Sequence, residues 1–594
     1  MRGRLMAAVI AVLLLVSLAA GAPAQSQEAS RVRVAIKGFE NNITPFTVAF
    51  GALPATNDIM HLVHDSLFWS QVSADPEPWL AESAESSDGG RMWTVTLRDG
   101  VQWHDGVPFT AEDVKFSFEF YRDQPGASGR YAHHVFDVPD FDRAEVVDPL
   151  TINLFFNAPA PQFEIMPGAD LPIVAKHVWE GIEEPGTATE MLPVGTGPYQ
   201  LVEIVPDQRY RLQANETYFK GRPTVDELEL VVIKDPASAF AALQTGDIDM
   251  VERTVPPELV EQFRNSSDIE VAESTRLESS QLYFNARKAP LTDPALRKAI
   301  SMAVDVDAIV DNVLLGSGRP GRDTFVHPDS PWAVPDGDHE YDPEAAREML
   351  DEAGYGATDP DGVRTAPDGT RLEFTALVSS FEPLEIRAVQ LIAQQVEEIG
   401  VRLSPEPLEP TALRSRRQAP PGEAPTFDLY VSNLEAHAHA DPDGLYYFFH
   451  SPGDRGFGGA ISGYSNPAYD ALAVEATTAE RDRRTELTAE MQEILAEEAP
   501  AIVMWYDPGL YAYRPAAYDG WVRDPGQGIF TKRSFLPEYV QEAAADGDQG
   551  STTTAASEED SGSTVWVVLI GALALAGVAA VIVSRRRTAE PDDE

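Results

Sequence analysis

Two hydrophobic stretches lie at opposite ends of this chain and constrain everything between them. The first, 6–16, follows Arg2 and Arg4 and precedes the small residues of 19–24. This order of a basic start, a short apolar middle and a small-residue exit is typical of a secretory signal peptide. The second stretch, 564–583, carries no charge and is long enough to cross ~30 Å of hydrocarbon as a helix.

The charges beside the second stretch predict its orientation. Arginines fill 585–587, and arginines favour the cytoplasmic side of a membrane. We therefore expect a signal peptide over 1–24, trimmed near Ala24, a transmembrane helix over 564–583 and a cytoplasmic tail over 584–594. The rest then lies at the cell surface, on the outer face of the cytoplasmic membrane, tethered by its C-terminal helix. The alternatives are a retained N-terminal anchor and a buried C-terminal core helix.

The composition excludes several classes of site and partner. The chain has 594 residues and no cysteine, so disulfides, thiolate metal sites and a lipid-modified cysteine are excluded. Its 45 basic and 95 acidic residues give a formal charge of −50, which argues against nucleic acid as a partner. The acidic residues are spread along the whole chain. They favour solubility in a salty or alkaline medium, and binding of a cationic partner is the alternative.

Between the two ends, short strands alternate with helices whose starts carry capping residues. This pattern predicts an α/β protein, and its length predicts two or three subdomains. Asp or Asn before proline begins several of the helices, and a capping box over 110–113 begins another. Strands are expected at 31–36, 93–98, 151–156, 199–204, 228–233, 282–285, 371–378, 401–403, 427–431 and 501–505, and helices at 235–243, 342–354, 385–399, 466–475 and 481–498, with further starts at 110, 293 and 306.

Five spaced motifs carry a resemblance to a known family. They are WTVTLRDGVQWHDGVPFTAEDVKFS at 93–117, VGTGPY at 194–199, ALQTGDID at 242–249, YFN at 283–285 with LRKAISMAVD at 296–305, and YDPEAAREMLDEAGY at 341–355. In this order they are similar to the family 5 extracellular solute-binding proteins of ABC importers, which include oligopeptide-, dipeptide- and nickel-binding proteins. The resemblance covers residues 31 to 540 approximately. Most motif residues are expected to be scaffold, because turn glycines, prolines and helix caps fill the motifs.

The resemblance implies a two-lobed, periplasmic-binding-protein-like fold of type II with an extra domain. The two lobes surround a cleft and are joined by crossing strands. The expected division is 31–55, 190–278 and 500–542 for the discontinuous first lobe, 56–189 for the extra domain, 279–499 for the second lobe and 543–563 for a disordered acidic stalk. The implied partners are a small-molecule or peptide ligand and ABC permease subunits in the membrane, and no cofactor is implied.

The strand and loop over 429–443 are the strongest candidate for a ligand site. In peptide-binding relatives the corresponding strand pairs with the ligand backbone, and an aspartate just beyond it holds the terminal amine. Here Ala438 occupies that aspartate position. Glu435 or Asp441 is expected to substitute for it.

His437 in the same loop raises a second possibility. With His439 it favours a nickel or zinc complex, because imidazole suits both metals and alternate residues of a strand face one side. An ordinary polar surface loop explains the two histidines equally simply. We therefore expect no bound metal, with this pair as the alternative.

Other ligand contacts are expected near the cleft from the loop after the first strand and from the strands that cross between lobes. Aromatic walls suit a sugar or a peptide side chain, although core packing explains many aromatic residues. These further candidates are Glu40, Asn42, Tyr283, Asn285, Asn433, Trp505 and Tyr506.

Together these features predict the solute-binding component of an ABC importer, which delivers peptides or peptide-like solutes to a permease. An oligosaccharide or a metal chelate is the alternative ligand, and a surface receptor is the alternative role. A hydrolase is disfavoured, because no Gly-x-Ser-x-Gly, His-Glu-x-x-His or phosphate-loop motif occurs. We therefore expect no enzyme activity.

Overall fold

The computed structural model describes residues 30–38, 44–46, 54–70, 76–123, 141–188, 192–275, 277–417, 425–434, 442–451 and 462–550. Both terminal hydrophobic stretches lie outside these residues. Within the described part of the chain, no helix combines the length and the apolar character needed to span a bilayer.

A seven-stranded sheet forms the first lobe, in the order β12-β21-β11-β1-β10-β9-β8. Its central strand, β1, runs parallel to β10 and β11, and helix α6 makes the crossover from β10 to β11 that parallel strands need. Helices α6 and α7 cover one face through a cluster that includes Phe240 and Phe263. The elements are β1 (Arg31–Ile36), β8 (Tyr199–Val205), β9 (Arg209–Ala214), β10 (Glu227–Val232), β11 (Met250–Val251), β12 (Glu270–Glu273), β21 (Leu510–Tyr513), α6 (Pro236–Thr245) and α7 (Pro257–Arg264).

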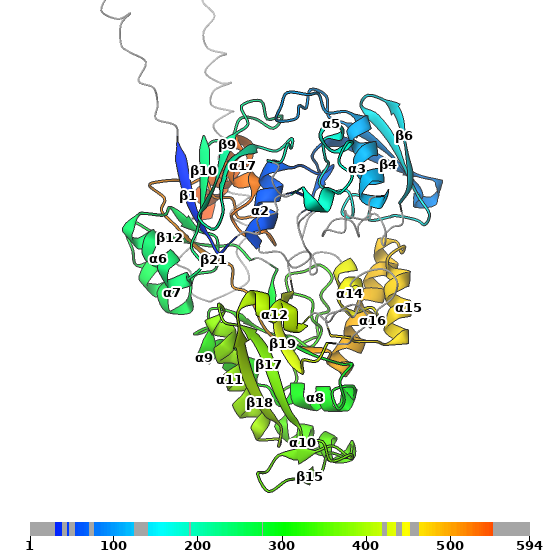
Figure 1. The fold of residues 1–594 in the computed structure, drawn as a ribbon, viewed down its shortest axis with the longest axis vertical. Coiled ribbons are helices and arrows are strands. Elements are labelled where there is room, and N and C mark those ends of the chain that lie inside the picture. The colour runs from blue at the N-terminus through cyan, green and yellow to red at the C-terminus, as the bar shows by residue number, and fades with distance from the viewer. Residues whose placement is uncertain are drawn as a thin grey trace, which may run out of the picture. The chain divides into compact units, whose positions relative to one another are not determined.

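A six-stranded sheet forms the second lobe, in the order β14-β20-β13-β19-β17-β18. Both faces are covered, because alternate residues of β13 enter different apolar clusters: Leu282 packs on one side and Tyr283 on the other. Figure 1 shows the helices of this lobe, which are listed below, around the sheet. The strands are β13 (Ser279–Phe284), β14 (Arg319–Pro320), β17 (Glu373–Ser379), β18 (Arg402–Leu408), β19 (Leu429–Leu434) and β20 (Ala501–Tyr506), and the helices are α8 (Pro294–Met302), α9 (Val306–Val313), α10 (Pro343–Glu352), α11 (Pro383–Glu397), α12 (Pro410–Arg417), α14 (Asp443–Phe449), α15 (Pro467–Ala476) and α16 (Arg481–Glu498).

A four-stranded antiparallel sheet, in the order β4-β5-β7-β6, belongs to the segment between β1 and β8. Helix α3 packs on it, and the Asp113 carboxylate accepts the Thr110 backbone N–H at 2.9 Å, which is one half of the predicted capping box. The elements are β4 (Ala81–Ser87), β5 (Met92–Leu97), β6 (Phe141–Asp148), β7 (Thr151–Phe156), α3 (Ala111–Asp123), α2 (Pro54–Val63) and α5 (Lys176–Trp179), with the short pairs β2 (Phe68–Trp69), β3 (Glu77–Pro78), β15 (Ala357–Thr358) and β16 (Arg364–Thr365) elsewhere.

Five of the predicted helix starts are confirmed by side-chain caps. A capping oxygen satisfies a backbone N–H that the helix itself leaves unpaired, and it contributes about 1 kcal/mol to stability. Five capping side chains accept such a hydrogen bond: Asp235, Asp293, Asp305, Asp342 and Asn466.

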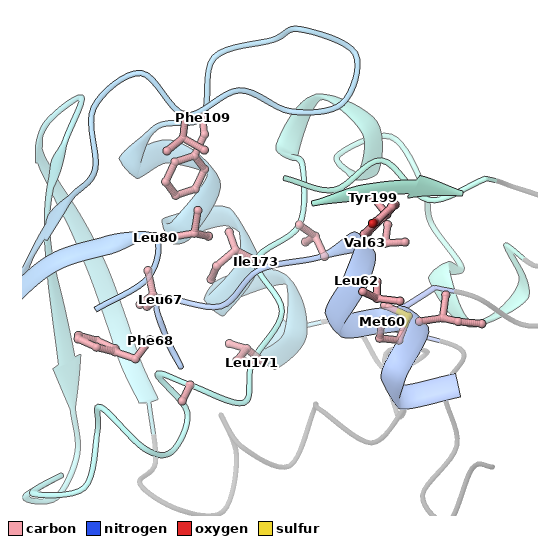
Figure 2. Packing of buried hydrophobic residues seen from close by; sticks show 14 of the residues in the cluster. Met60, Leu62, Val63, Leu67, Phe68, Leu80, Phe109, Leu171, Ile173 and Tyr199 are labelled. Atoms are coloured by element: carbon pink, nitrogen blue, oxygen red, sulfur yellow. The ribbon is translucent and has the colours of Figure 1, made fainter. Parts of the chain in front are cut away.

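The VGTGPY motif is a point of close packing against α2. A Cβ added to Gly195 would lie 1.8 Å from the Val63 carbonyl oxygen, and one added to Gly197 would lie 2.5 Å from the Leu62 carbonyl oxygen. Only glycine permits this approach of two backbones. Figure 2 shows the core that results, with Tyr199 of β8 beside the end of α2. The motif is therefore scaffold, as predicted.

A buried ion pair fastens the same region to the C-terminal part of the chain. The Lys532 Nζ and Asp65 Oδ1 atoms lie 2.5 Å apart, and both side chains are almost fully buried. Asp65 also accepts hydrogen bonds from the Trp79 Nε1 atom at 2.7 Å and from the Thr196 hydroxyl at 2.9 Å. A buried carboxylate needs such a full set of donors. Through them Asp65 links the region around Trp79 to Thr196 and to Lys532, which are far apart in the sequence.

The chain crosses between the two large sheets twice, side by side. β12 leads into β13 on the way out, and β20 leads into β21 on the way back. β12 pairs with β21, and β13 pairs with β20. The predicted division placed residues from 500 onward in the first lobe. β20 instead lies in the second sheet, so the return crossing follows Tyr506.

The first part of the segment predicted to be a disordered stalk is helical. Helix α17 (Pro537–Gly550) includes the first residues of the segment 543–563. The run of alanines over 543–545 explains the difference, because alanine has the highest helix propensity. The rest of the segment lies outside the described residues.

Gly509 offers a test of the crossing. Its φ is +61°, and a Cβ there would lie 2.2 Å from the Ser274 carbonyl oxygen on the neighbouring crossing segment. We expect Gly509→Ala to lower stability by about 2–4 kcal/mol, from the left-handed backbone and from the clash together. The measurement is the thermal unfolding midpoint.

Gly316→Ala is the matched control for that variant. Gly316 has a φ of +77° but nothing within 4 Å of an added Cβ, so only the backbone penalty of ~1 kcal/mol applies. Equal losses in the two variants would contradict the close packing of the crossing segments.

Candidate functional site

A cavity of about 510 Å³ lies where residues of the two large sheets meet beside the crossing. This volume is within the usual range of small-molecule sites. The first-sheet side contributes Lys37, Asp235, Glu252, Arg253, Thr254 and Glu258, the crossing contributes Glu278 and Asp507, and the second-sheet side contributes Ser279, Ser280, Glu382, Glu385, Arg387, Asn433 and Trp505. A ligand here would contact residues of both sheets.

One row of side chains runs across the second sheet and forms a wall of the cavity. Ser280 of β13 is directly opposite Asn433 of β19 on one side and Trp505 of β20 on the other. Directly opposed residues of antiparallel strands project to the same face. Because all three line the cavity, this face of the strand ends is the one available to a ligand.

Helix α11 places two glutamates above this row. Glu385 is only 8% exposed, and its Oε1 atom accepts a hydrogen bond from the Ser280 hydroxyl at 3.3 Å. Glu382, one turn earlier, forms an ion pair with Lys37, which follows β1. That ion pair joins the first sheet to the second lobe across the cavity.

Burial sets the protonation of Glu385. Loss of hydration raises the pKa of its carboxyl to about 8, and repulsion from Glu382 acts in the same direction. The positive charge of Lys37 and the hydrogen bond from Ser280 oppose this shift in pKa. The cavity therefore holds a carboxyl group that is largely protonated at neutral pH in this structure.

Asp507 fixes the edge of the cavity beside the crossing. Its Oδ1 atom accepts hydrogen bonds from the Thr254 hydroxyl and from the Gly509 backbone N–H, both at 2.7 Å. The Asp507 N–H in turn donates to the Glu278 carbonyl oxygen at 3.0 Å. This edge ties a first-sheet residue to both crossing segments.

Two of the predicted ligand residues line this cavity, and three lie elsewhere. Asn433 and Trp505 are in the lining. Tyr283 is stacked on a neighbouring ring in the core, the Asn285 amide donates to the Phe427 carbonyl oxygen at 2.8 Å, and the Tyr506 hydroxyl donates to the Val326 carbonyl oxygen at 3.2 Å. For these three a ligand contact stays a prediction, and the contacts shown are structural.

The remaining predicted residues lie outside the described part of the chain. They are Glu40, Asn42, Glu435, His437, His439 and Asp441. Within the described residues, no three histidine or carboxylate side chains are grouped as a metal site.

Sequence reasoning missed the charged groups that dominate the lining. Lys37, Glu252 and Asp507 each follow a first- or second-sheet strand by one residue, a position that the strand pattern could have marked. Glu382 and Glu385 gave no such signal, because acidic residues in the first turn of a helix are common. Only the packing of α11 on the sheet shows that one of them is buried.

The raised pKa of Glu385 predicts a pH dependence of stability. Between about pH 4.5 and 8 the folded protein keeps a proton that the unfolded chain has lost, so the free energy of unfolding falls as pH rises through this window. Glu385→Gln removes that penalty. We expect the free energy of unfolding of this variant, relative to the wild type, to be up to a few kcal/mol higher at about pH 8.5 than at about pH 5. Each unit by which the pKa is raised corresponds to ~1.4 kcal/mol.

Urea unfolding of the two proteins at about pH 5 and pH 8.5 measures this difference. Glu258→Gln is the control, because Glu258 lines the same cavity but is exposed. Parallel pH profiles for Glu385→Gln and the wild type would contradict the buried, protonated carboxyl.

Comparison with known proteins agrees with this architecture. Residues 75–456 match the family described as "Bacterial extracellular solute-binding proteins, family 5 Middle". The chain is 29% identical over 479 residues to heme-binding protein A of Haemophilus influenzae, covering 76% of this chain and 83% of that protein. It is 26% identical over 502 residues to the oligopeptide-binding protein AppA of Bacillus subtilis, covering 82% and 88%.

Solved structures show the same fold. The structure of AppA from Bacillus subtilis with a nonapeptide aligns with a TM-score of 0.73 at 23% identity, covering 84% of this chain and 97% of that one. A periplasmic oligopeptide-binding protein from Thermotoga maritima with mannohexaose bound aligns with a TM-score of 0.73 at 24% identity, covering 88% and 98%. The architecture is thus the two-lobed α/β fold of periplasmic binding proteins. With the family match spanning most of the chain, the protein belongs to the bacterial extracellular solute-binding proteins of family 5.

Proposed function

We propose that this chain is the solute-binding component of an ABC importer and captures peptides or peptide-like solutes in the cavity between its two sheets. The observation that carries the proposal is a cavity lined from both sheets beside a double crossing. A solute bound there holds the lobes together, and movement at the crossing releases it to the permease. This role needs no covalent chemistry, so no enzyme activity is proposed.

Peptides are the proposed solutes for two reasons. One relative is named an oligopeptide-binding protein, and one solved neighbour holds a nonapeptide. In addition, β19 ends at Leu434 immediately after the cavity residue Asn433, and an extended peptide can pair with such a strand end. An oligosaccharide or a metal chelate remains the competing solute.

The loop after β19 is the proposed amine-binding part of the site. Glu435 is only two residues beyond Asn433 in sequence, and His437 and Asp441 follow. We propose that Glu435 or Asp441 holds the terminal amine of a peptide. Glu40 and Asn42 are proposed as further contacts, because they follow the cavity residue Lys37 closely.

The domain division and the membrane topology are also proposals. We assign 31–55, 190–278 and 507–542 to the first lobe, 56–189 to the extra domain and 279–506 to the second lobe. Residues 1–24 are proposed as a signal peptide and 564–583 as a membrane anchor, from the sequence alone. The support is the sheet membership of each strand and the charge pattern beside each hydrophobic stretch.

Peptide binding is tested by thermal shift with mixed di- to pentapeptides. A ligand that binds only the folded state adds about 2.7 kcal/mol of stability at ~100 times its dissociation constant. We expect a shift with peptides that Asn433→Trp abolishes, because the large ring fills the cavity at an exposed lining position. Asn312→Trp, at an exposed site on α9, is the control and should bind normally. A shift with mannohexaose or a nickel–histidine complex, and none with peptides, would refute the peptide assignment.

The topology is tested by adding protease to intact cells. If residues 564–583 anchor the chain from outside, cleavage within 551–563 releases an ectodomain that still binds peptide. Complete protection of the chain would contradict the proposed orientation, and release without protease would contradict the anchor.

A further inference from the structure

Glu385 stands out among the carboxylates of the cavity because it is buried and short of partners. It is 8% exposed, whereas Glu258 in the same lining is exposed. The hydrogen bond from the Ser280 hydroxyl, 3.3 Å from Oε1, is the one recorded for its side chain among the described residues. A carboxylate has about four acceptor sites, and this hydrogen bond occupies one of them.

Among the described residues, no cation of the lining forms an ion pair with Glu385. Lys37 is in an ion pair with Glu382. Arg253 and Arg387 also line the cavity, but neither forms an ion pair with Glu385 in the described part of the structure. A buried carboxyl group in this position either keeps a proton or meets a cation that comes from elsewhere.

The surroundings suit an incoming cation. Carboxylates outnumber cationic side chains in the lining, seven to three: Asp235, Glu252, Glu258, Glu278, Glu382, Glu385 and Asp507 against Lys37, Arg253 and Arg387. Trp505 is directly opposite Ser280 in the same row, belongs to the apolar cluster of this lobe and also lines the cavity. An aromatic ring in a cavity lining can add to the binding of an ammonium or guanidinium group.

We propose that Glu385 receives a cationic side chain of the bound peptide, a lysine ammonium or an arginine guanidinium, and so makes the cavity selective for basic peptides. This inference rests on the proposed function, which assigns the terminal amine of the peptide to the loop after β19. The second positive charge of a basic peptide then remains for Glu385.

Release of the Glu385 proton on binding distinguishes a direct ion pair with Glu385 from a general electrostatic attraction of basic peptides to the acidic cavity. The groups that act on Glu385 are Glu382 just before α11, Lys37 after β1 and the Ser280 hydroxyl of β13, and burial raises the pKa of Glu385 to about 8. A cation that pairs with the carboxylate must displace its proton. Affinity for a basic peptide should therefore rise with pH up to about 8, whereas affinity for a neutral peptide should not.

The test is calorimetric titration of the purified full-length protein with trilysine and trialanine at about pH 7. Glu385→Gln keeps an acceptor for Ser280 and cannot ionise when a cation binds. We expect it to weaken trilysine binding roughly 30-fold or more, as for loss of one member of a buried charge pair, and to change trialanine binding less than about threefold. The exposed Glu258→Gln is the matched control and should weaken trilysine binding only slightly.

Each outcome decides between specific readings. If Glu385→Gln weakens the binding of both peptides equally, Glu385 binds the terminal amine and the inference is overturned. If Glu385→Gln and Glu258→Gln weaken trilysine binding equally, the effect is a general electrostatic attraction to the acidic cavity, which also overturns the inference. Failure of the wild type to bind both trialanine and trilysine would overturn the proposed function itself. The difference between the binding heats in phosphate and in Tris buffer gives the number of protons released on binding. Proton release with trilysine that is absent in Glu385→Gln supports the pairing. Equal binding heats of the wild type in the two buffers contradict it.

If Glu385→Gln does not fold, Glu385→Asp provides the second variant. It retains the charge but shortens the side chain, so it should keep proton release while losing about tenfold in affinity for trilysine. Unchanged affinity together with no proton release would overturn the inference.

Discussion

The double crossing between the sheets is the constraint on which the rest of the structure depends. β12 pairs with β21 in one sheet, and β13 pairs with β20 in the other. The whole second lobe is therefore inserted between two adjacent antiparallel segments. Asp507 links these segments to Thr254, and Gly509 permits their close approach. Because both connections leave the sheets at neighbouring strand ends, residues at these ends contribute to the shared cavity.

The site follows from this arrangement and from the period of a β-strand. Ser280, Asn433 and Trp505 share one row and one face, and α11 packs over that face. The adjacent residue Tyr506 belongs to the opposite face and to the other core cluster. This wall of the cavity is therefore formed by one row of residues on three strands together with the first turn of a helix.

Much of the fold was predictable from the sequence, because its signals are local. Asp and Asn residues that cap helices act within a few residues, and alternating strands have a fixed period. The site was less predictable. Trp505 and Tyr506 are both aromatic and adjacent in sequence, and only the pairing of β20 in the sheet shows which one lines the cavity. The burial of Glu385 depends on residues more than one hundred positions away, such as Ser280.

The central claim, that a peptide binds between the two sheets, is tested most directly by hydrogen exchange with and without a bound peptide. We predict slower exchange on both sides of the cavity at once, at 252–256 after β11 and at 382–387 on α11, with further protection at the crossing residues 507–509. Protection confined to one lobe, or located away from these segments, would contradict the account.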